Sequence, residues 1–138
     1  MTDLTRVSIS LETELLERFD RLAALQGYPT RSEALKGLMR SDLVQAQWVH
    51  GRSVAGAVTL VYDHHRRNVV SRLLDVQHDF HSVIVSTQHV HLDHNHCLEI
   101  VVVKGSASRI RRLLAALKSV KGIKHSALVM TAVGNALA

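Results

Sequence analysis

The sequence contains one cysteine, few aromatic residues and no hydrophobic run long enough to cross a membrane. One cysteine cannot form a disulfide within the chain, and the N-terminus has no secretory hydrophobic segment, so we expect a cytoplasmic protein. Aromatic residues make up only 4% of the chain, which argues against the base-stacking surfaces of single-strand binders. Hydrophobic residues make up 46% of the 138 positions, enough for one ordinary domain or two small ones.

The net charge of +5 is unevenly distributed along the chain. Residues 1–50 hold slightly more acidic than basic side chains, so the whole positive excess lies beyond them. The later basic residues form two clusters, Arg66 with Arg67, and Arg109 with Arg111 and Arg112. Net charge alone therefore does not locate a nucleic-acid surface, and each basic side chain has to be judged by its position.

The N-terminal segment predicts one strand followed by two helices. Residues 4–11 alternate apolar and polar side chains, the period of a strand with one buried face. Helical spacing follows and ends at Gly27, a typical residue for a helix C-cap. Thr30 and Glu33 then form a capping-box signature, which predicts a second helix over residues 31–47.

A single strand needs a partner for its backbone groups, and this segment offers no second strand. The simplest solution is a two-fold dimer in which each strand pairs with its twin and the helices share one core. The polar row Arg6, Ser8 and Ser10 would then face outward on a two-stranded ribbon, which fits the major groove of DNA. We expect these side chains to contact DNA; the alternative is a plain solvent-facing surface.

The ribbon RVSISL and the turn and helix GYPTRSEALKGLMR resemble the ribbon-helix-helix family of bacterial repressors and antitoxins. The resemblance covers residues 4–47. It implies that the start of the second helix anchors a DNA phosphate near Thr30, Arg31 and Ser32. A helix N-terminus also favours an anion on physical grounds, because its backbone N–H groups are unpaired.

The pattern changes after a short connector, residues 48–53. The periodicity predicts strand, helix, strand, strand, helix and strand, in that order, over residues 54–62, 66–75, 83–92, 97–104, 106–120 and 123–133. This is the ferredoxin-like βαββαβ order. The sequence therefore predicts an α+β protein with a ribbon-helix-helix domain over 1–50 and a ferredoxin-like domain over 51–138.

The segment HVHLDHNHC, residues 89–97, carries the clearest chemical signal. Alternate side chains of a strand share a face, so His89 and His91 point the same way. Cys97 follows a short turn, and a returning antiparallel strand would bring its sulfur beside them. Imidazole and thiolate suit nickel, copper and zinc rather than magnesium or calcium. The alternative is a histidine-rich surface hairpin with a buried structural cysteine.

Three donors leave a metal one ligand short of four. His78, near the end of a predicted helix, could complete the set from its own chain or from a neighbouring subunit. Such donors suit tetrahedral zinc and equally suit square-planar nickel or copper. Glu99 either orients a ligand or is a surface carboxylate. Among the other histidines, His81 is a weak candidate for extra metal binding, and His94 and His96 are expected to be solvated. No metal role is assigned to His50, His64, His65 and His125.

The whole chain is similar to one family, the nickel-responsive transcriptional regulators. The motifs YDHHRRNVVSRL, QHDFHS, TQHVHLDHNHCLEI and VVVKG carry the similarity and stand in the family's order. The resemblance implies a homotetrameric, nickel-dependent repressor of double-stranded operator DNA. It also implies one square-planar Ni²⁺ per chain, held by His89, His91 and Cys97 of one chain and His78 of a second chain.

Two further expectations concern coupling between metal and DNA. A site shared by two chains links metal occupancy to subunit arrangement, and couplings of about 1–3 kcal/mol are typical. Arg66 and Arg67 could then contact phosphates, or else remain solvated charges. The family often has an acidic residue in the second helix that helps bind an ion between the domains. Gly37 stands there, although Glu33 remains, so that ion site is not expected.

Two other functions fit part of the pattern. One is a metal-buffering or metal-delivery protein, in which the N-terminal segment serves only for dimerisation. The other is a ribbon-helix-helix regulator whose ferredoxin-like domain senses a small organic ligand. An enzyme is not expected, because the sequence shows no paired carboxylates, nucleophile constellation or phosphate loop with catalytic spacing.

Overall fold

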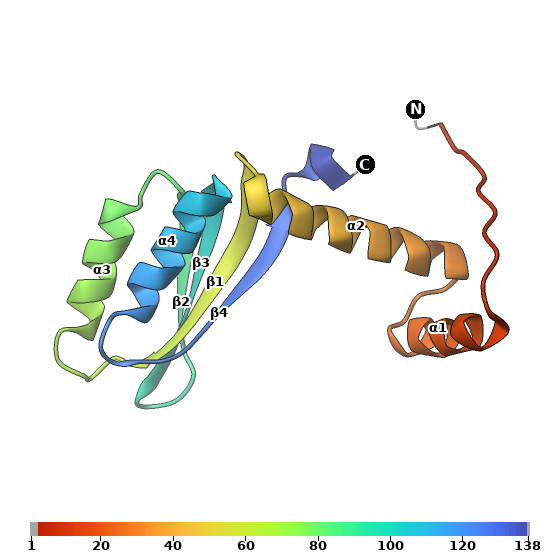
Figure 1. Cartoon of the computed structure of the whole chain (residues 1–138). Coiled ribbons are helices and arrows are strands. Elements are labelled where there is room, and N and C mark those ends of the chain that lie inside the picture. The colour runs from red at the N-terminus through yellow and green to blue at the C-terminus, as the bar shows by residue number, and fades with distance from the viewer. Residues whose placement is uncertain (1–2, 138) are drawn as a thin grey trace. The chain divides into compact units, whose positions relative to one another are not determined.

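The computed structural model describes residues 3–137 (Figure 1). In chain order the elements are α1 (Thr13–Leu25), α2 (Arg31–His50), β1 (Val54–Asp63), α3 (Val69–Asp79), β2 (Ile84–His91), β3 (His96–Gly105), α4 (Ala107–Lys118), β4 (Ile123–Ala132) and the 3₁₀ turn η1 (Gly134–Leu137). The chain divides into two compact units between Arg40 and Ser41. Among the described helices, none is long and apolar enough to span a membrane.

The N-terminal unit confirms both predicted helices. α1 ends just before Gly27, whose φ of +85° lies in the left-handed region. The backbone N–H of Glu33 donates a 3.1 Å hydrogen bond to Oγ1 of Thr30, which confirms the N-cap of α2. Residues 3–12 run as an extended segment that pairs with no strand of the same chain (Figure 1). The predicted strand over residues 4–11 is therefore not formed within a single copy, as expected of a strand that pairs with its twin.

Most apolar side chains of the N-terminal unit are exposed in one copy. Val7 and Ile9, on the apolar side of the extended segment, are 79% and 66% exposed. Within the described part of this unit, only Ala23 and Ala34 are buried. The helices likewise expose large apolar side chains, namely Leu15, Leu22, Leu25, Leu38 and Met39. One copy thus builds almost no core, as the dimer argument expects of so short a unit.

The second unit is an antiparallel sheet in the order β2-β3-β1-β4, with α3 and α4 lying side by side on one face (Figure 1). This confirms the ferredoxin-like βαββαβ arrangement. β1 lies between β3 and β4, and its side chains alternate between buried and half-buried. The buried row meets the apolar faces of α3 and α4 to form one core, which includes Val58, Leu60, Leu73, Val101, Ile110, Leu113 and Leu117.

The expected connector over residues 48–53 is wrong in its first part, because α2 continues to His50. Trp48 is only 1% exposed and belongs to the core of the second unit. Its indole N–H donates a 2.7 Å hydrogen bond to the carbonyl oxygen of Thr131. The ring also lies against Gly56, where a Cβ would approach it to 3.1 Å. Burial of this large side chain gives a reason for the extra helical turn.

The helix expected from residue 66 begins three residues later, at Val69. Asn68, which precedes it, has a φ of +66°, in the left-handed region that does not continue a helix. Arg66 instead closes a turn, since its N–H donates to the carbonyl oxygen of Asp63 at 3.1 Å. The other predicted helix of this domain is confirmed with its cap: the N–H of Arg109 donates to Oγ of Ser106 at 3.2 Å.

Candidate metal centre

A β-hairpin positions the predicted donors. In the pairing of β2 with β3, His91 lies opposite Cys97 and His89 lies opposite Glu99. Asp93 organises the turn between the strands, because its Oδ1 accepts the N–H groups of Asn95 at 2.9 Å and His96 at 2.8 Å. The hairpin is therefore formed as predicted, and the register puts His89, His91 and Cys97 on one face of the sheet.

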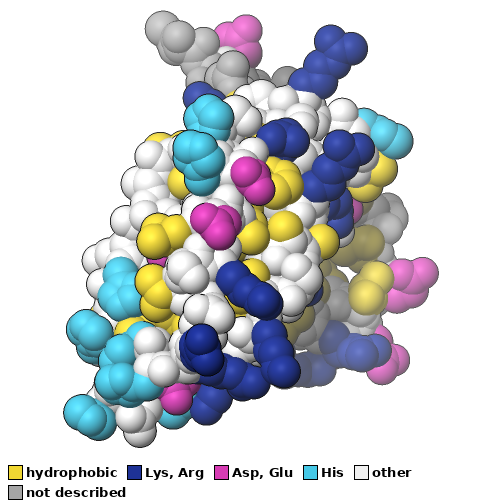
Figure 2. Space-filling view, turned by 90° about the vertical axis from the view of Figure 1, so that its left-hand side faces the viewer, with side chains coloured by type: hydrophobic (Ala, Val, Ile, Leu, Met, Phe, Trp, Pro, Cys, Tyr) yellow, Lys and Arg dark blue, Asp and Glu magenta, His cyan; other side chains and the backbone are white. Residues whose placement is uncertain are grey.

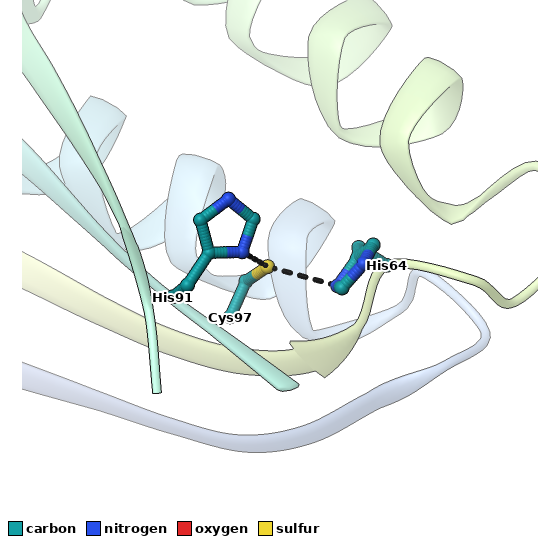
Figure 3. Close-up of side chains that lie close together, drawn as sticks. All are labelled: His64, His91 and Cys97. Atoms are coloured by element: carbon teal, nitrogen blue, oxygen red, sulfur yellow. Dashed lines mark hydrogen bonds between the residues drawn. The ribbon is translucent and has the colours of Figure 1, made fainter. Parts of the chain in front are cut away.

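Two imidazoles approach the thiol of Cys97 (Figure 3). Its Sγ lies 3.6 Å from Nδ1 of His91 and 3.2 Å from Nδ1 of His64. The three donor atoms all lie within 4.8 Å of one another, which is close enough to hold one ion. His64 was assigned no metal role from the sequence, yet it lies nearer to the sulfur than His91 does.

The position of His64 follows from the pairing of β1 with β3. Asp63, the last residue of β1, lies opposite His96 in this register. Tyr62, one residue earlier, lies opposite Cys97, and His64 follows Tyr62 by two positions on the same side of the chain. The backbone N–H of His64 donates to the carbonyl oxygen of Asn95 at 3.3 Å, and its ring reaches back to the sulfur of Cys97. The doublet His64–His65 directly after a predicted strand was the available signal, but the sequence does not specify this long-range register.

His89 is held by hydrogen bonds that run through Tyr62 to Glu99, rather than by a contact with Cys97. Its Nδ1 lies 3.2 Å from the hydroxyl oxygen of Tyr62, and that hydroxyl donates to Oε2 of Glu99 at 3.4 Å. Because the Tyr62 proton is directed to Glu99, the Tyr62 oxygen accepts the proton of His89 Nδ1. This tautomer leaves the lone pair of His89 Nε2 free for a metal, an arrangement common among metal-binding histidines.

Glu99 is the buried carboxylate of the site. It is only 8% exposed, so the alternative of a surface carboxylate is wrong. Besides the Tyr62 hydroxyl, it accepts a 3.3 Å hydrogen bond from Nε2 of Gln77, in the last turn of α3. Glu99 thus joins α3 to the hairpin through Gln77 on one side and Tyr62 on the other, and orients His89 through Tyr62.

Burial also sets the protonation of the donors. Burial raises the pKa of the Cys97 thiol, and the nearby carboxyl of Glu99 adds to the rise. Burial lowers the pKa of His64, and the neighbouring imidazoles of His65 and His91 lower it further. The metal-free chain therefore presents a neutral thiol and a neutral imidazole at neutral pH. A metal that binds Cys97 has to displace the thiol proton.

The donor set fits a borderline transition metal. Imidazole nitrogen and thiolate sulfur suit nickel, zinc and copper, whereas magnesium and calcium require oxygen ligands. Both carboxylate oxygens of Glu99 already accept hydrogen bonds, Oε2 from Tyr62 and Oε1 from Gln77. The metal donors that lie close together around Cys97 are therefore nitrogen and sulfur atoms. The chemistry of the site therefore agrees with a nickel-type centre.

Two family models match the two units. Residues 55–131 match the NikR C terminal nickel binding domain, and residues 5–44 match the ribbon-helix-helix protein, copG family. The chain belongs to the nickel-responsive regulator family. It is thus a regulator with a ribbon-helix-helix DNA-binding unit, which acts on DNA as a dimer, and with a nickel-binding C-terminal domain; it is not an enzyme.

Relatives named as nickel-responsive regulators are similar over nearly their whole length. A protein from Chlorobaculum tepidum is 54% identical over 125 residues, covering 91% of this chain and 93% of its own. One from Pyrococcus abyssi is 48% identical over 136 residues, covering 98% and 99%. A solved structure of an uncharacterized protein from Thermotoga maritima shares the fold alone, with a TM-score of 0.52 and 18% identity over 56% of this chain and 96% of that one.

The other described histidines of this regulator lie outside the three-donor set. His78 is exposed in the last turn of α3, and its ring centroid lies 6.0 Å from that of His81. His96 is bonded through Nδ1 to Asp93 and through Nε2 to Lys124, at 3.0 and 2.8 Å. Within one chain the structure therefore joins His91 and Cys97 with His64, places the ring of His89 5.3 Å from that of His91, and leaves His78 outside the donor set.

Basic side chains gather near the start of α3. Arg66, Arg67, Asn68, Arg72 and Lys121 line one hollow of the second unit. Viewed from the side of α3 and α4, Figure 2 shows Lys and Arg side chains along the lower edge, next to a group of histidines. The two arginines expected from the sequence to contact phosphate thus belong to a larger basic cluster, and sequence reasoning missed Arg72 and Lys121.

In the N-terminal unit, Arg6, Ser8 and Ser10 are all exposed. Arg31 is exposed as well but already has a partner, since its Nε and Nη2 donate to the two carboxylate oxygens of Asp20 at 3.0 and 2.8 Å. This pairing lowers the pKa of Asp20. A phosphate at the start of α2 would therefore compete with Asp20 for Arg31.

Proposed function

We propose that this chain is a nickel-dependent transcriptional repressor whose affinity for operator DNA rises when its C-terminal domain binds nickel. The observation that supports this best is the hairpin register, which sets His91 opposite Cys97 and His89 opposite Glu99, with Nδ1 of His89 engaged by Tyr62. This centre lies in the nickel-binding domain of a chain whose other unit binds DNA. In this proposal residues 51–138 sense the metal and residues 1–50 read the operator, in the cytoplasm.

The proposed nickel ligands are His89, His91 and Cys97 of one chain and His78 of a second chain, with one Ni²⁺ per chain. The exposure of His78 supports its assignment to another chain. Gln77, the preceding residue, is already bonded to Glu99, so the last turn of α3 is fixed with respect to the centre. Three nitrogens and one thiolate are a donor set that suits square-planar nickel(II).

A ligand from a second chain makes nickel a link between subunits. If ribbons pair two chains and shared centres join two such pairs, the assembly is a homotetramer, a dimer of dimers. Nickel then favours the subunit arrangement that completes its ligand set, and it strengthens DNA binding only if that arrangement suits two operator half-sites. A coupling of about 1–3 kcal/mol would tighten DNA binding about 5–150-fold.

The proposed DNA contacts come from both units. Arg6, Ser8 and Ser10 read base edges from the ribbon, because they alternate with Val7 and Ile9 along the extended segment and are exposed. Ser32 and Arg31 hold a phosphate at the start of α2 once Arg31 leaves Asp20. Arg66 and Arg67 add phosphate contacts from the basic cluster before α3.

The test is DNA binding by the full chain with and without nickel. An operator is first selected from a random duplex library in the presence of Ni²⁺, and affinities are then measured by fluorescence anisotropy at fixed salt. We expect nickel to tighten binding of the parent, Cys97→Ala to abolish the increase, and Arg6→Ala to remove sequence preference. His125→Gln, which changes an exposed histidine of β4, serves as the control and should behave as the parent.

Other results would favour the other functions. Weak DNA binding that ignores both sequence and nickel would indicate a metal-buffering protein and contradict the proposal. Sequence-specific binding that Cys97→Ala leaves unchanged would indicate a regulator of another ligand, and small organic effectors would then be screened.

A further inference from the structure

His64 has no part in the proposed nickel set, yet it is the histidine nearest to Cys97. Its Nδ1 lies 3.2 Å from the sulfur, and its ring centroid lies 5.5 Å from that of His91. It is half-buried and held at the end of β1 by its backbone bond to Asn95. Within one chain, it is therefore a preformed donor.

The geometry of this trio suits a small metal ion. Metal–nitrogen bonds of about 2.0 Å and metal–sulfur bonds of about 2.3 Å at a tetrahedral angle put adjacent donors roughly 3.5 Å apart. The observed separations from Cys97 Sγ to Nδ1 of His64 and of His91 are 3.2 and 3.6 Å. Both histidines present the same nitrogen, Nδ1, to the sulfur (Figure 3). His89 differs, since its Nδ1 is engaged by Tyr62.

We propose that one chain by itself binds a tetrahedral divalent ion such as Zn²⁺ through Nδ1 of His64, Nδ1 of His91 and Sγ of Cys97, with water as the fourth ligand. This inference rests on the proposed function in one respect, because the single-chain site shares His91 and Cys97 with the proposed nickel set. The two sites are therefore mutually exclusive in any one chain. Occupying one of them removes two ligands from the other.

The two sites differ in what they do to the assembly. The nickel set uses His89 and draws His78 from a second chain, so it links metal binding to subunit arrangement. The single-chain site needs neither residue, so an ion bound there leaves the arrangement of chains unchanged and has no means of raising DNA affinity. Zinc has no geometric preference from its d electrons and accepts the tetrahedral site, whereas nickel is favoured by a square-planar set of four donors.

This arrangement gives the regulator a way to discriminate between metals that bind with similar strength. Intrinsic affinities do not separate neighbouring transition metals reliably, so selectivity has to come from geometry. Here the histidine that joins His91 and Cys97 in binding the metal would decide the effect on DNA binding. A complex that uses His64 would leave DNA affinity unchanged, and a complex that uses His89 would raise it.

The test uses Co²⁺ alone, a probe whose visible absorption is intense in a tetrahedral site with a thiolate ligand. Three full-length variants are titrated beside the parent: His64→Gln, His89→Gln and, as the matched control, His65→Gln. The ring centroid of His65 lies 4.0 Å from that of His64, with the two rings tilted by 42°, but His65 lies outside the trio. We expect His64→Gln to weaken Co²⁺ binding at least about tenfold, with loss of the intense bands. His89→Gln and His65→Gln should keep the Co²⁺ affinity and the intense absorption bands of the parent.

A Ni²⁺ titration of the same variants separates this inference from the proposed function. If His64→Gln binds Co²⁺ as the parent does, the proposed single-chain site is wrong. The proposed nickel set still holds in that case if the nickel absorption band persists in His64→Gln and is lost in His89→Gln. If nickel binding instead depends on His64 and not on His89, the proposed nickel set is wrong while the trio remains. Thermal unfolding of the metal-free variants, expected to match the parent, checks that a lost band reflects a lost ligand.

Discussion

The hydroxyl oxygen of Tyr62 lies 3.2 Å from Nδ1 of His89 and links this exposed histidine to the buried carboxylate of Glu99. Tyr62 is itself buried, and burial together with the charge of Glu99 raises the pKa of its hydroxyl well above the usual range. The hydroxyl therefore stays protonated and continues to donate to Glu99. In this way a core residue of β1 fixes the tautomer of a proposed nickel ligand on β2.

Replacing Tyr62 with phenylalanine should weaken nickel binding without unfolding the domain. The variant keeps the ring in the core but removes the contact that orients His89, and losing such a partner typically lowers metal affinity about 10–100-fold. It also leaves Glu99 with Gln77 as its remaining donor, at a cost to stability of about 1–3 kcal/mol. Competition for Ni²⁺ with a chelator measures the affinity. Tyr28→Phe, in the N-terminal unit, is the control, and equal nickel affinity in the two variants would show that Tyr62 does not orient a ligand.

Nickel binding should release the proton of Cys97. Burial raises the pKa of this thiol, so it is protonated in the metal-free chain at neutral pH, whereas a metal binds the thiolate. The apparent nickel affinity should therefore rise about tenfold per pH unit for this one proton, between about pH 7 and 8.5. Chelator competition at a series of pH values measures the slope. A flat profile across this range would mean that Cys97 either does not bind the metal or is already ionised.

Replacing Asp20 with asparagine should strengthen DNA binding. The change frees the guanidinium of Arg31, whose two bonds to Asp20 would otherwise compete with a phosphate. One additional phosphate contact should steepen the dependence of log affinity on log salt concentration by about one charge. Anisotropy titrations over several salt concentrations measure this slope. Glu17→Gln removes the same charge from the same helix, and an equal effect in both variants would point to general electrostatics rather than to Arg31.

Local sequence patterns were sufficient for the two helices of the N-terminal unit, for the order of the elements in the second unit and for part of the centre. The caps at Thr30 and Ser106 were predictable because each depends on a residue only three positions away. His89, His91 and Cys97 were predictable as neighbours because strand alternation and one short hairpin are enough to set them on a common face.

Features that depend on distant contacts were not predictable. His64 meets Cys97 only because β1 pairs with β3 in one particular register, which no local pattern specifies. The burial of Trp48 in the second unit likewise depends on a partner 83 residues away, the carbonyl of Thr131. The late start of α3 follows from the left-handed backbone of Asn68, a conformation that asparagine tolerates but does not require.

Replacing Gly56 with alanine should destabilise the metal-binding domain, because Trp48 and β4 leave no space for a Cβ. A Cβ at this position would lie 2.6 Å from the carbonyl oxygen of Val129 and 3.1 Å from the Trp48 ring. The first of these is backbone paired within the sheet, so it cannot move aside easily, and overpacking of this kind costs about 1–3 kcal/mol. Chemical unfolding of the metal-free chain, followed by the fluorescence of its one tryptophan, measures the loss. Gly134→Ala, where a Cβ meets nothing within 4 Å, should leave the midpoint unchanged. An unchanged midpoint in Gly56→Ala as well would mean that Trp48 does not pack against β1 in solution.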